Sequence, residues 1–336
     1  MEVTLKDIAK EIGVSISTVS RAMNLQDRNA SDMQKKIQET AKAMGYADKK
    51  ALLLSNMAKP SFSIGCLFIS EHESIVSPFF AELHRGILQE VKKLSPYADI
   101  TLTTLSIPSI EAIAQNNFDG VIILGRTKRE TIADIGKTVT HCVYAGLNPI
   151  PGIDNVISDI KEGIKDIVSH LYENGRRSIG FIGPVSIDSS AFNEYRHDAY
   201  LSAMKGLSLP VSPALVQESY LDASNGYDAT LAMLDAGGKP DAIVCGNDNL
   251  AIGVMKALMT RGISVPKEVA LAGYDNIPDS AYLTPSLTTV DVPKSDIGRH
   301  ALLLLLDAIE SGRDYPITMT LPHTLLVRES TKEVSR

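Results

Sequence analysis

The sequence predicts a small all-helical domain followed by a larger α/β core with two doubly wound parallel sheets. The first sixty residues contain only short amphipathic segments of helix length, whereas from Ser61 onward apolar runs of strand length alternate with amphipathic segments. This alternation is typical of parallel sheets covered by helices on both faces. About 270 residues of it exceed the usual size of one domain, so we expect two lobes.

Composition divides the chain in the same way. Its 336 residues carry a net charge of −7, which argues against nucleic-acid binding by the whole surface. Residues 1–60 nevertheless hold ten Lys and Arg against seven Asp and Glu, so a mildly basic head precedes an acidic body. No apolar run reaches the roughly 18 residues of a membrane helix, and the first residues lack the pattern of a secretory signal. We therefore expect no membrane partner and a cytoplasmic location.

The head, residues 1–46, is expected to form three short helices. Thr4 followed by Asp7 resembles a capping box, and an apolar face follows at helical spacing: Leu5, Ile8, Ala9 and Ile12. Gly13 breaks this helix, and a second helix begins near Ser15 or Ile16. The third helix runs from about Ser31 to Gly45 with the apolar stripe Met33, Ile37, Ala41 and Met44.

The first two helices predict a DNA-binding surface. Two short helices joined by a glycine turn, with a small Ala9 at their crossing, form a helix-turn-helix whose second helix enters a major groove. Ile16 and Ser17 would then meet base edges, and Arg21 could read a guanine. Short polar side chains on the same helix suit phosphate oxygens: Ser15, Thr18, Ser20 and Asn24. Periodicity alone also allows Ile16 and Val19 both to be core residues.

The stretch TLKDIAKEIGVSISTVSRAMN, followed by AKAMGY, resembles the N-terminal signature of the LacI/GalR (lactose repressor/galactose repressor) family of transcriptional regulators. FDGVIILG, GNDNLAIGVMKAL and VALAGYDN follow in the family's order. The resemblance implies a helix-turn-helix head, a hinge helix within residues 47–61, and a two-lobed, periplasmic-binding-protein-like core over residues 62–332. One lobe would take residues 62–157 and 290–318, and the other residues 158–289 and 319–332.

The same resemblance places the hinge around Ala51 to Leu54 as a further DNA contact. Leu54 matches the family leucine that wedges into the operator's minor groove, where insertion unstacks a base step and bends the DNA. The chain departs from the family at Lys49 and Leu52, and it has one extra residue before Ile64. The alternative is that these leucines pack on the neighbouring lobe.

The core is expected to bind a small-molecule sugar effector in the cleft at the carboxyl ends of its strands. Guanidinium, amide and carboxylate groups grip vicinal hydroxyls with paired hydrogen bonds, and Arg196, Asn247 and Asp275 match effector contacts of the family. Asp248 is expected to cap the following helix. Asp275 could instead be an ordinary turn residue.

The first lobe contributes the other wall of this cleft. Phe79 and Phe80 match the family segment that lines it, although both rings could be ordinary core. Gly146 stands where some members keep an aspartate, and Asn148 lies two residues on. The overall spacing most resembles the galactoside-responsive branch, so galactose or a β-galactoside is the expected effector.

Nothing in the sequence predicts catalysis. HExxH, GxSxG and Walker A motifs are absent, the seven histidines have no metal-ligand spacing, and Cys66, Cys142 and Cys245 lie in apolar runs. We expect reduced core cysteines, no catalytic residue, no metal and no cofactor. The competing class is a sugar-binding or sugar-converting protein whose head has another use, which would not need the DNA-reading helix.

A homodimer is expected because one head covers only half of a pseudo-palindromic operator. The helix PFFAELHRGILQEV is the predicted dimer surface, and the absence of trailing heptads favours a dimer over a tetramer. Sugar binding would release the operator. The alternative is that the ligand acts as a co-repressor and tightens DNA binding, as in purine-responsive relatives. The sequence predicts the two sites but not whether binding at one strengthens or weakens binding at the other.

Overall fold

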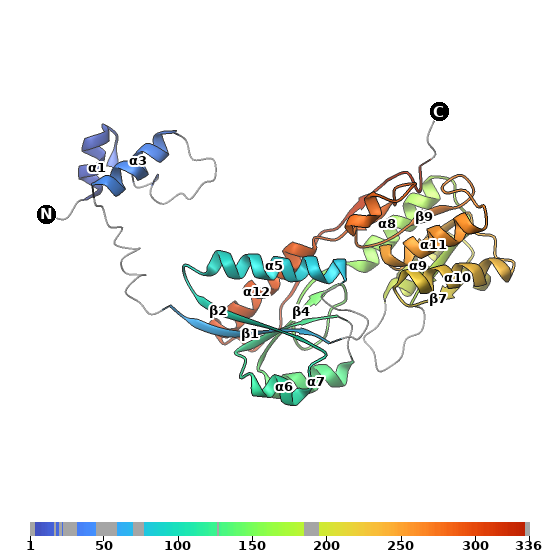
Figure 1. Ribbon diagram of the computed structural model, residues 1–336, viewed down its shortest axis with the longest axis horizontal. Coiled ribbons are helices and arrows are strands. Elements are labelled where there is room, and N and C mark those ends of the chain that lie inside the picture. Colours follow the sequence, from blue (N-terminus) through green and yellow to red (C-terminus); the bar gives the residue numbers. More distant parts are fainter. Residues whose placement is uncertain are drawn as a thin grey trace. The chain divides into compact units, whose positions relative to one another are not determined.

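The computed structural model describes residues 4–16, 18–19, 22, 32–44, 59–69, 77–125, 128–184 and 195–332. The chain divides into two compact units, Met1–Ser61 with Pro96–Asp99 and Phe62–Ser95 with Ile100–Arg336 (Figure 1). The first unit contains the predicted head, and the second contains the two-lobed core. Among the described residues, no helix combines the length and the apolar content needed to cross a membrane.

The first helix of the head, α1 (Leu5–Ile12), starts at the predicted cap. The Thr4 amide and hydroxyl both donate to the Asp7 carboxylate, at 2.8 and 2.6 Å, and these bonds lower the pKa of Asp7. The helix ends at Gly13, whose φ of 77° is left-handed and suits glycine. Helical backbone resumes at Ile16, and the Thr18 amide donates to the Ser15 hydroxyl at 3.1 Å. Ser15 therefore caps the second helix where the sequence predicted its start.

The core of the head resolves the ambiguity over Ile16 and Val19. Val19 is fully buried, whereas 48% of Ile16 is exposed. The buried cluster also includes the helix α3 (Asp32–Ala43) through Ile37 and Ala41. Met33 is 49% exposed, so its assignment to the apolar stripe is wrong. Spacing identified the correct face, but the packed cluster covers that face only from Ile37 onward.

The first lobe of the core is a six-stranded sheet in the order β11-β5-β4-β3-β1-β2. Its strands are β1 (Ser61–Phe68), β2 (Asp99–Ser106), β3 (Gly120–Leu124), β4 (His141–Gly146), β5 (Asp154–Ser158) and β11 (Thr318–Leu321). The pairs β1–β3, β3–β4, β4–β5 and β5–β11 are parallel. Because β11 belongs to this sheet, the first lobe extends past the predicted boundary at residue 318.

Helices cover both faces of this sheet (Figure 1). One face carries α5 (Pro78–Leu94) and α12 (Lys294–Ser311), and the other carries α6 (Ile110–Gln115) and α7 (Arg129–Thr138). The α6 and α7 face encloses a core in which Ile113 and Ile135 pack against strand residues such as Val121 and Ile123. The doubly wound arrangement follows from strands that are apolar on both faces.

The second lobe is a four-stranded parallel sheet in the order β7-β6-β8-β9. Its strands are β6 (Ile179–Gly183), β7 (Val216–Glu218), β8 (Ala242–Cys245) and β9 (Ala270–Ala272). Its helices are α8 (Ile160–Glu173), α9 (Tyr195–Gly206), α10 (Ala223–Asp235) and α11 (Asp248–Thr260), with short 3-10 turns η1 (Pro213–Leu215) and η2 (Pro278–Ala281). Helix α8 packs on α9, and α10 packs on α11.

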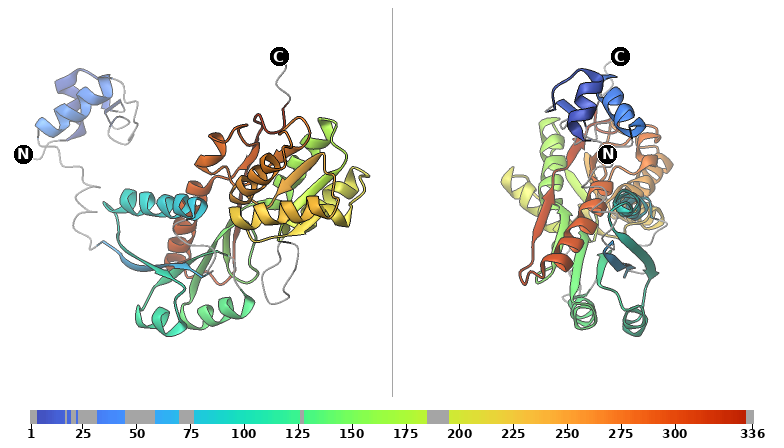
Figure 2. Two further views of the ribbon diagram at one scale, coloured as in Figure 1. Left: turned by 45° about the vertical axis from the view of Figure 1, so that its right-hand side comes forward. Right: turned by 90° about the vertical axis from the view of Figure 1, so that its left-hand side faces the viewer.

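Three connections join the two lobes, which Figure 2 shows from two further directions. Strand β5 leads into α8, β10 (Thr289–Asp291) leads into α12, and β11 leads into β12 (Thr324–Leu326). Strands β10 and β12 pair with each other in antiparallel fashion. The three cysteines are free and buried, as predicted, and burial raises the pKa of Cys66 and Cys142 to about 12.

Candidate functional site

A cavity of about 350 Å³ is lined by residues of both lobes. This volume lies within the usual range of small-molecule sites. All five predicted effector residues line it: Phe79, Phe80, Arg196, Asn247 and Asp275. Residues 79 and 275 are nearly two hundred positions apart in the chain, and the carboxyl ends of the parallel strands bring them together. The structure therefore assembles the predicted set in one place, and its role in binding stays a prediction.

Phe79 and Phe80 form the start of the first-lobe wall. They lie in the first turn of α5, where Pro78 suits the helix start. Their rings meet edge to face with centroids 5.0 Å apart, and the Phe80 ring meets Phe68 in the same way at 6.3 Å. Both rings are thus packed in an aromatic cluster and also line the cavity, so the two alternatives drawn from the sequence are compatible.

The rest of the first-lobe wall comes from β4 and the turn after it. Tyr144 and Gly146 share one face of the strand because alternate residues do. A Cβ added to Gly146 would lie 2.4 Å from the Tyr144 hydroxyl oxygen, so the tyrosine fills the space of a side chain at 146. Asn148 is 7% exposed, and its Oδ1 atom has no hydrogen-bond partner among the described residues. This wall offers a phenol and an amide.

The helix cap that the sequence predicted for Asp248 is formed by Asn247 instead. Asn247 caps α11, with its Oδ1 accepting from the Leu250 amide at 2.9 Å and its Nδ2 donating to the Leu221 carbonyl at 3.2 Å. The prediction that Asp248 caps the helix is wrong, because its fully buried side chain turns inward. It accepts from the Ile277 amide at 2.9 Å. Burial and the charge of Asp275 raise the pKa of Asp248 to about 8.

Asp275 is both a turn residue and part of the cavity wall. It follows β9 with a φ of 102°, and Asn276 follows with 50°. Left-handed backbone is uncommon outside glycine and costs of order 1 kcal/mol or more per residue, so the surroundings must hold this turn. Asn276 does so by donating to Asp291 at 2.9 Å and accepting from Arg328 at 2.7 Å.

Several residues of the cavity wall were not predicted from the sequence, among them Tyr144, Tyr220, Asp222 and Asn249. Tyr220 is 60% exposed and lies just beyond β7, a strand of three residues that is too short to leave a pattern in the sequence. Among the residues that the structure describes, the charged ones that line the cavity are Arg196, Asp222 and Asp275. One cation with two carboxylates gives this described part of the wall no excess positive charge for an anionic ligand.

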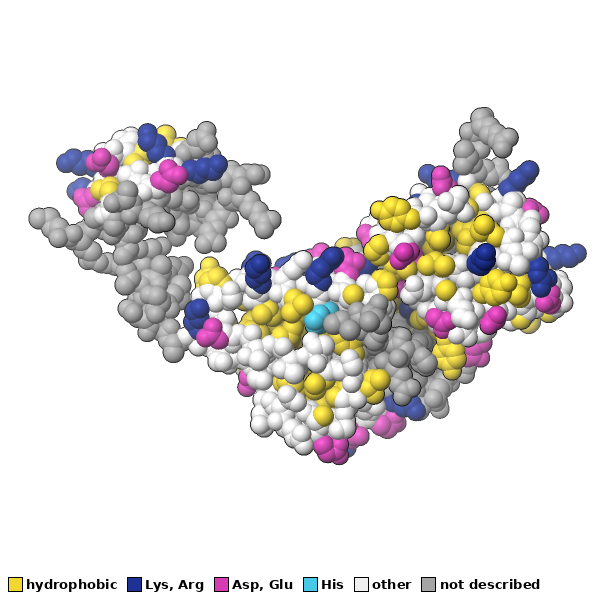
Figure 3. Space-filling view, viewed as in Figure 1, with side chains coloured by type: hydrophobic (Ala, Val, Ile, Leu, Met, Phe, Trp, Pro, Cys, Tyr) yellow, Lys and Arg dark blue, Asp and Glu magenta, His cyan; other side chains and the backbone are white. Residues whose placement is uncertain are grey.

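The structure describes three of the predicted DNA contacts. Ser15, Ile16 and Thr18 are exposed, and the hydroxyls of Ser15 and Thr18 lie 2.8 Å apart in a hydrogen bond. Lysine and carboxylate side chains are interspersed on the described surface of this unit (Figure 3). The other predicted contacts lie outside the described residues: Ser17, Ser20, Arg21, Asn24, Ala51 and Leu54.

Residues 4–48 match the family described as "Bacterial regulatory proteins, lacI family", and residues 168–331 match the "Periplasmic binding protein-like domain". The HTH-type transcriptional repressor MelR of Bacillus subtilis (strain 168) is 29% identical over 343 residues, which cover 98% of this chain and 97% of MelR. Catabolite control protein A of Priestia megaterium is 28% identical, with 99% of this chain and 100% of that protein covered.

Solved structures share the fold. The regulator CelR in a cellobiose complex gives a TM-score of 0.70 at 24% identity, over 98% of this chain and 100% of that chain. A LacI family regulator from Enterococcus faecium with bound ribose gives 0.69 at 25% identity, over 81% of this chain and 100% of that chain. The helix-turn-helix head and the two-lobed α/β core predicted from sequence are therefore confirmed.

Proposed function

We propose that this chain, which belongs to the lacI family of bacterial regulatory proteins, represses transcription by holding operator DNA and releases it when a sugar enters the cavity of the core. The observation that carries the proposal is the assembly of five sequence-derived effector residues around one cavity. The chain also carries a capped helix-turn-helix head, which a simple sugar binder would not need.

On DNA, the second helix of the head reads a half-site. Val19 packs inside while Ile16 stays exposed, so the apolar side chain at 16 is available for a thymine methyl group. We propose that Arg21 reads a guanine, that Ser17 contacts a base edge as Ile16 does, and that Leu54 wedges into the minor groove. A homodimer then covers a pseudo-palindromic operator. Helix α5 supplies the dimer surface, where Leu88 is 47% exposed.

In the cavity, the effector is an uncharged sugar. Arg196 and Asp275 pair with neighbouring hydroxyls, since guanidinium and carboxylate form strong charge-assisted hydrogen bonds. Tyr220 and the two phenylalanines offer apolar faces to sugar C–H groups. Galactose or a β-galactoside is the first candidate, from the spacing of the chain. The ribose bound by the Enterococcus faecium regulator supports the broader class of sugars.

Two measurements on the full chain test this proposal. Selection from random DNA should return a pseudo-palindrome, and Arg21→Ala should abolish binding to it while sugar affinity stays unchanged. Undiminished operator affinity in Arg21→Ala would refute the DNA-reading assignment.

A thermal-shift screen with D-galactose, lactose, D-ribose, cellobiose and purine bases identifies the effector. Repeating the titration with operator should show weaker sugar binding, because the coupling between two sites is reciprocal. Equal sugar affinity with and without operator would contradict the mechanism, and a purine that tightens operator binding would assign the chain to co-repressor control.

A further inference from the structure

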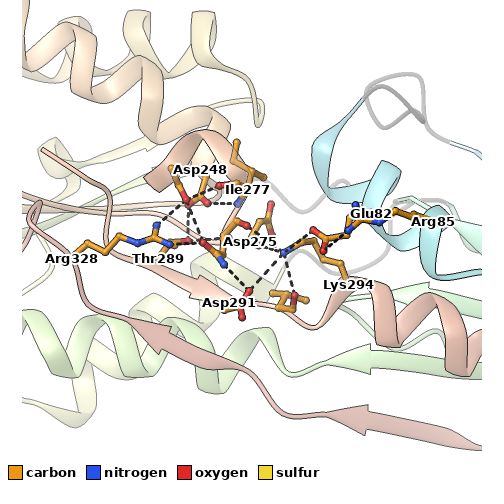
Figure 4. A network of polar contacts seen from close by, with 12 residues as sticks. Glu82, Arg85, Asp248, Asp275, Ile277, Thr289, Asp291, Lys294 and Arg328 are labelled. Atoms are coloured by element: carbon orange, nitrogen blue, oxygen red, sulfur yellow. Dashed lines mark hydrogen bonds and ion pairs between the residues drawn. The ribbon is translucent and has the colours of Figure 1, made fainter. Parts of the chain in front are cut away.

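Lys294 is a buried lysine at the place where the two lobes meet. It is the first residue of α12 and only 3% exposed. Its ammonium donates to the Asp275 carbonyl at 2.5 Å and to the Val292 carbonyl at 3.2 Å, and it lies 3.7 Å from the Glu82 carboxylate (Figure 4). A cation at a helix N-terminus opposes the helix dipole, and a buried charge is costly unless it is paired. Its specific partners must therefore offset both costs.

On the side of the first lobe, the position of Lys294 is rigid. A Cβ on Gly298 would lie 2.0 Å from the Leu83 carbonyl oxygen, and a Cβ on Gly86 would lie 2.0 Å from the Ser295 carbonyl oxygen. Helices α5 and α12 thus touch backbone to backbone at two glycines. This contact packs α12 closely on α5 and places Lys294 beside Glu82, which follows Phe80 of the cavity wall by two residues.

On the side of the second lobe, Lys294 holds the turn that carries Asp275. Three other side chains hold the same turn, Asp248 through the Ile277 amide, and Arg328 and Asp291 through the Asn276 side chain. Asp248 and Arg328 belong to the second lobe, and Asp291 ends the connecting strand β10. Of these four side chains, only that of Lys294 lies on a helix of the first lobe, so we expect a change in the angle between the lobes to strain its bond to Asp275.

We propose that Lys294 is the positioning residue that couples the effector cavity to the first lobe. Movement of the Asp275 turn is transmitted through the ammonium to Glu82 and α5, and movement of α5 is transmitted back to the turn. The part of this inference that concerns the effector rests on the proposed function, whereas the tie between the lobes does not.

The tie can be tested without sugar or DNA. Spin labels on Lys137→Cys in α7 and Lys256→Cys in α11, both exposed positions, report the distance between the lobes. The three native thiols are buried and have raised pKa values, so they react slowly with the label. Lys294→Met should widen the distance distribution. The control Lys165→Met, which removes an exposed ion pair with Glu162, should leave it unchanged.

An unchanged distribution in Lys294→Met would overturn the proposal. Glu82→Gln provides a second variant that keeps the fold, because Glu82 is partly exposed. It should widen the distribution less than Lys294→Met, since the bond to Asp275 remains. If Lys294→Met fails to fold, an unchanged distribution in Glu82→Gln overturns the tie.

The effect of D-galactose on operator affinity distinguishes coupling from a purely structural role of Lys294, because a structural role would leave this effect unchanged. In Lys294→Met the sugar should still bind, but its effect on operator affinity should fall ~10-fold, the usual worth of a charge-assisted hydrogen bond. A full operator response in Lys294→Met would overturn the coupling. Absence of any sugar response in the wild type would contradict the proposed function and leave the distance result standing.

Discussion

Gly298→Ala is expected to destabilise the core by about 2 kcal/mol. The added Cβ would lie 2.0 Å from the Leu83 carbonyl oxygen, so α5 and α12 must separate by about 1.4 Å to reach an ordinary contact. Overpacking lowers the free energy of unfolding by ~1–3 kcal/mol, and the upper value applies because the Leu83 carbonyl belongs to the backbone and cannot rotate out of the way as a side chain could. The better helix propensity of alanine raises the free energy of unfolding by ~1 kcal/mol. The melting temperature should therefore fall by ~4–8 °C.

Gly136→Ala is the matched control for this variant. Gly136 lies inside α7, and an added Cβ there would meet nothing within 4 Å. The same chemical change should therefore raise stability by up to ~1 kcal/mol. Thermal unfolding followed by circular dichroism measures both variants. A melting temperature of Gly298→Ala equal to or above that of the wild type would show that α5 and α12 separate easily. The close contact between these helices would then not fix Lys294 beside Glu82.

Three further predictions concern charged side chains. Arg196→Lys should weaken sugar binding ~10-fold in calorimetric titration, because lysine lacks the planar fork that pairs with two hydroxyls; equal affinity would remove Arg196 from the site. Arg313→Met should lower the free energy of unfolding by ~3 kcal/mol in urea, because the buried carboxylate of Asp154 loses its cation and keeps, among the described residues, only the hydrogen bond from the Ile317 amide; a loss near zero would contradict this. Asp248, with a pKa raised to about 8, keeps a proton in the folded state that the unfolded chain releases near pH 4, so stability should fall as pH rises from 5 to 8. Asp248→Asn should flatten this dependence, and an equal slope in both proteins would refute it.

The sequence predicted the elements that carry long apolar runs. Strands β1, β3 and β8 overlap the apolar runs SIGCLFIS, DGVIILG and DAIVCGND. Helices α5, α8 and α11 overlap the amphipathic segments PFFAELHRGILQEVKKL, EGIKDIVSHLYENG and DNLAIGVMKALMTRG. The short strands β7 and β10 were missed because three residues carry no period, and they are held by the sheet and ribbon around them. Helix α10 was also missed, since its first half reads ASNGYDA and offers no apolar stripe.

The sequence predicted those residues of the candidate site whose positions follow from the fold. Parallel strands bring their carboxyl ends to one edge, so polar residues after β8 and β9 had to converge. Which of two adjacent polar residues turns inward was not predictable, because Asn and Asp cap helices equally well. Asn247 took the cap and Asp248 took the buried position. Tyr144 was missed because a strand buried on both faces does not reveal which face meets a cavity.

The contact that couples the two lobes could not be predicted from a local sequence pattern. Lys294 follows a proline at a helix start, a context in which lysine usually points to solvent. Its burial depends on Glu82 and Asp275, which are distant in sequence and belong to different lobes. The chemistry of a site can thus be predicted from strand ends, whereas the link between lobes depends on how the lobes are placed. Substitutions at Arg196 and Lys294 should therefore separate the two properties, the first changing sugar affinity and the second changing what sugar binding does to the operator.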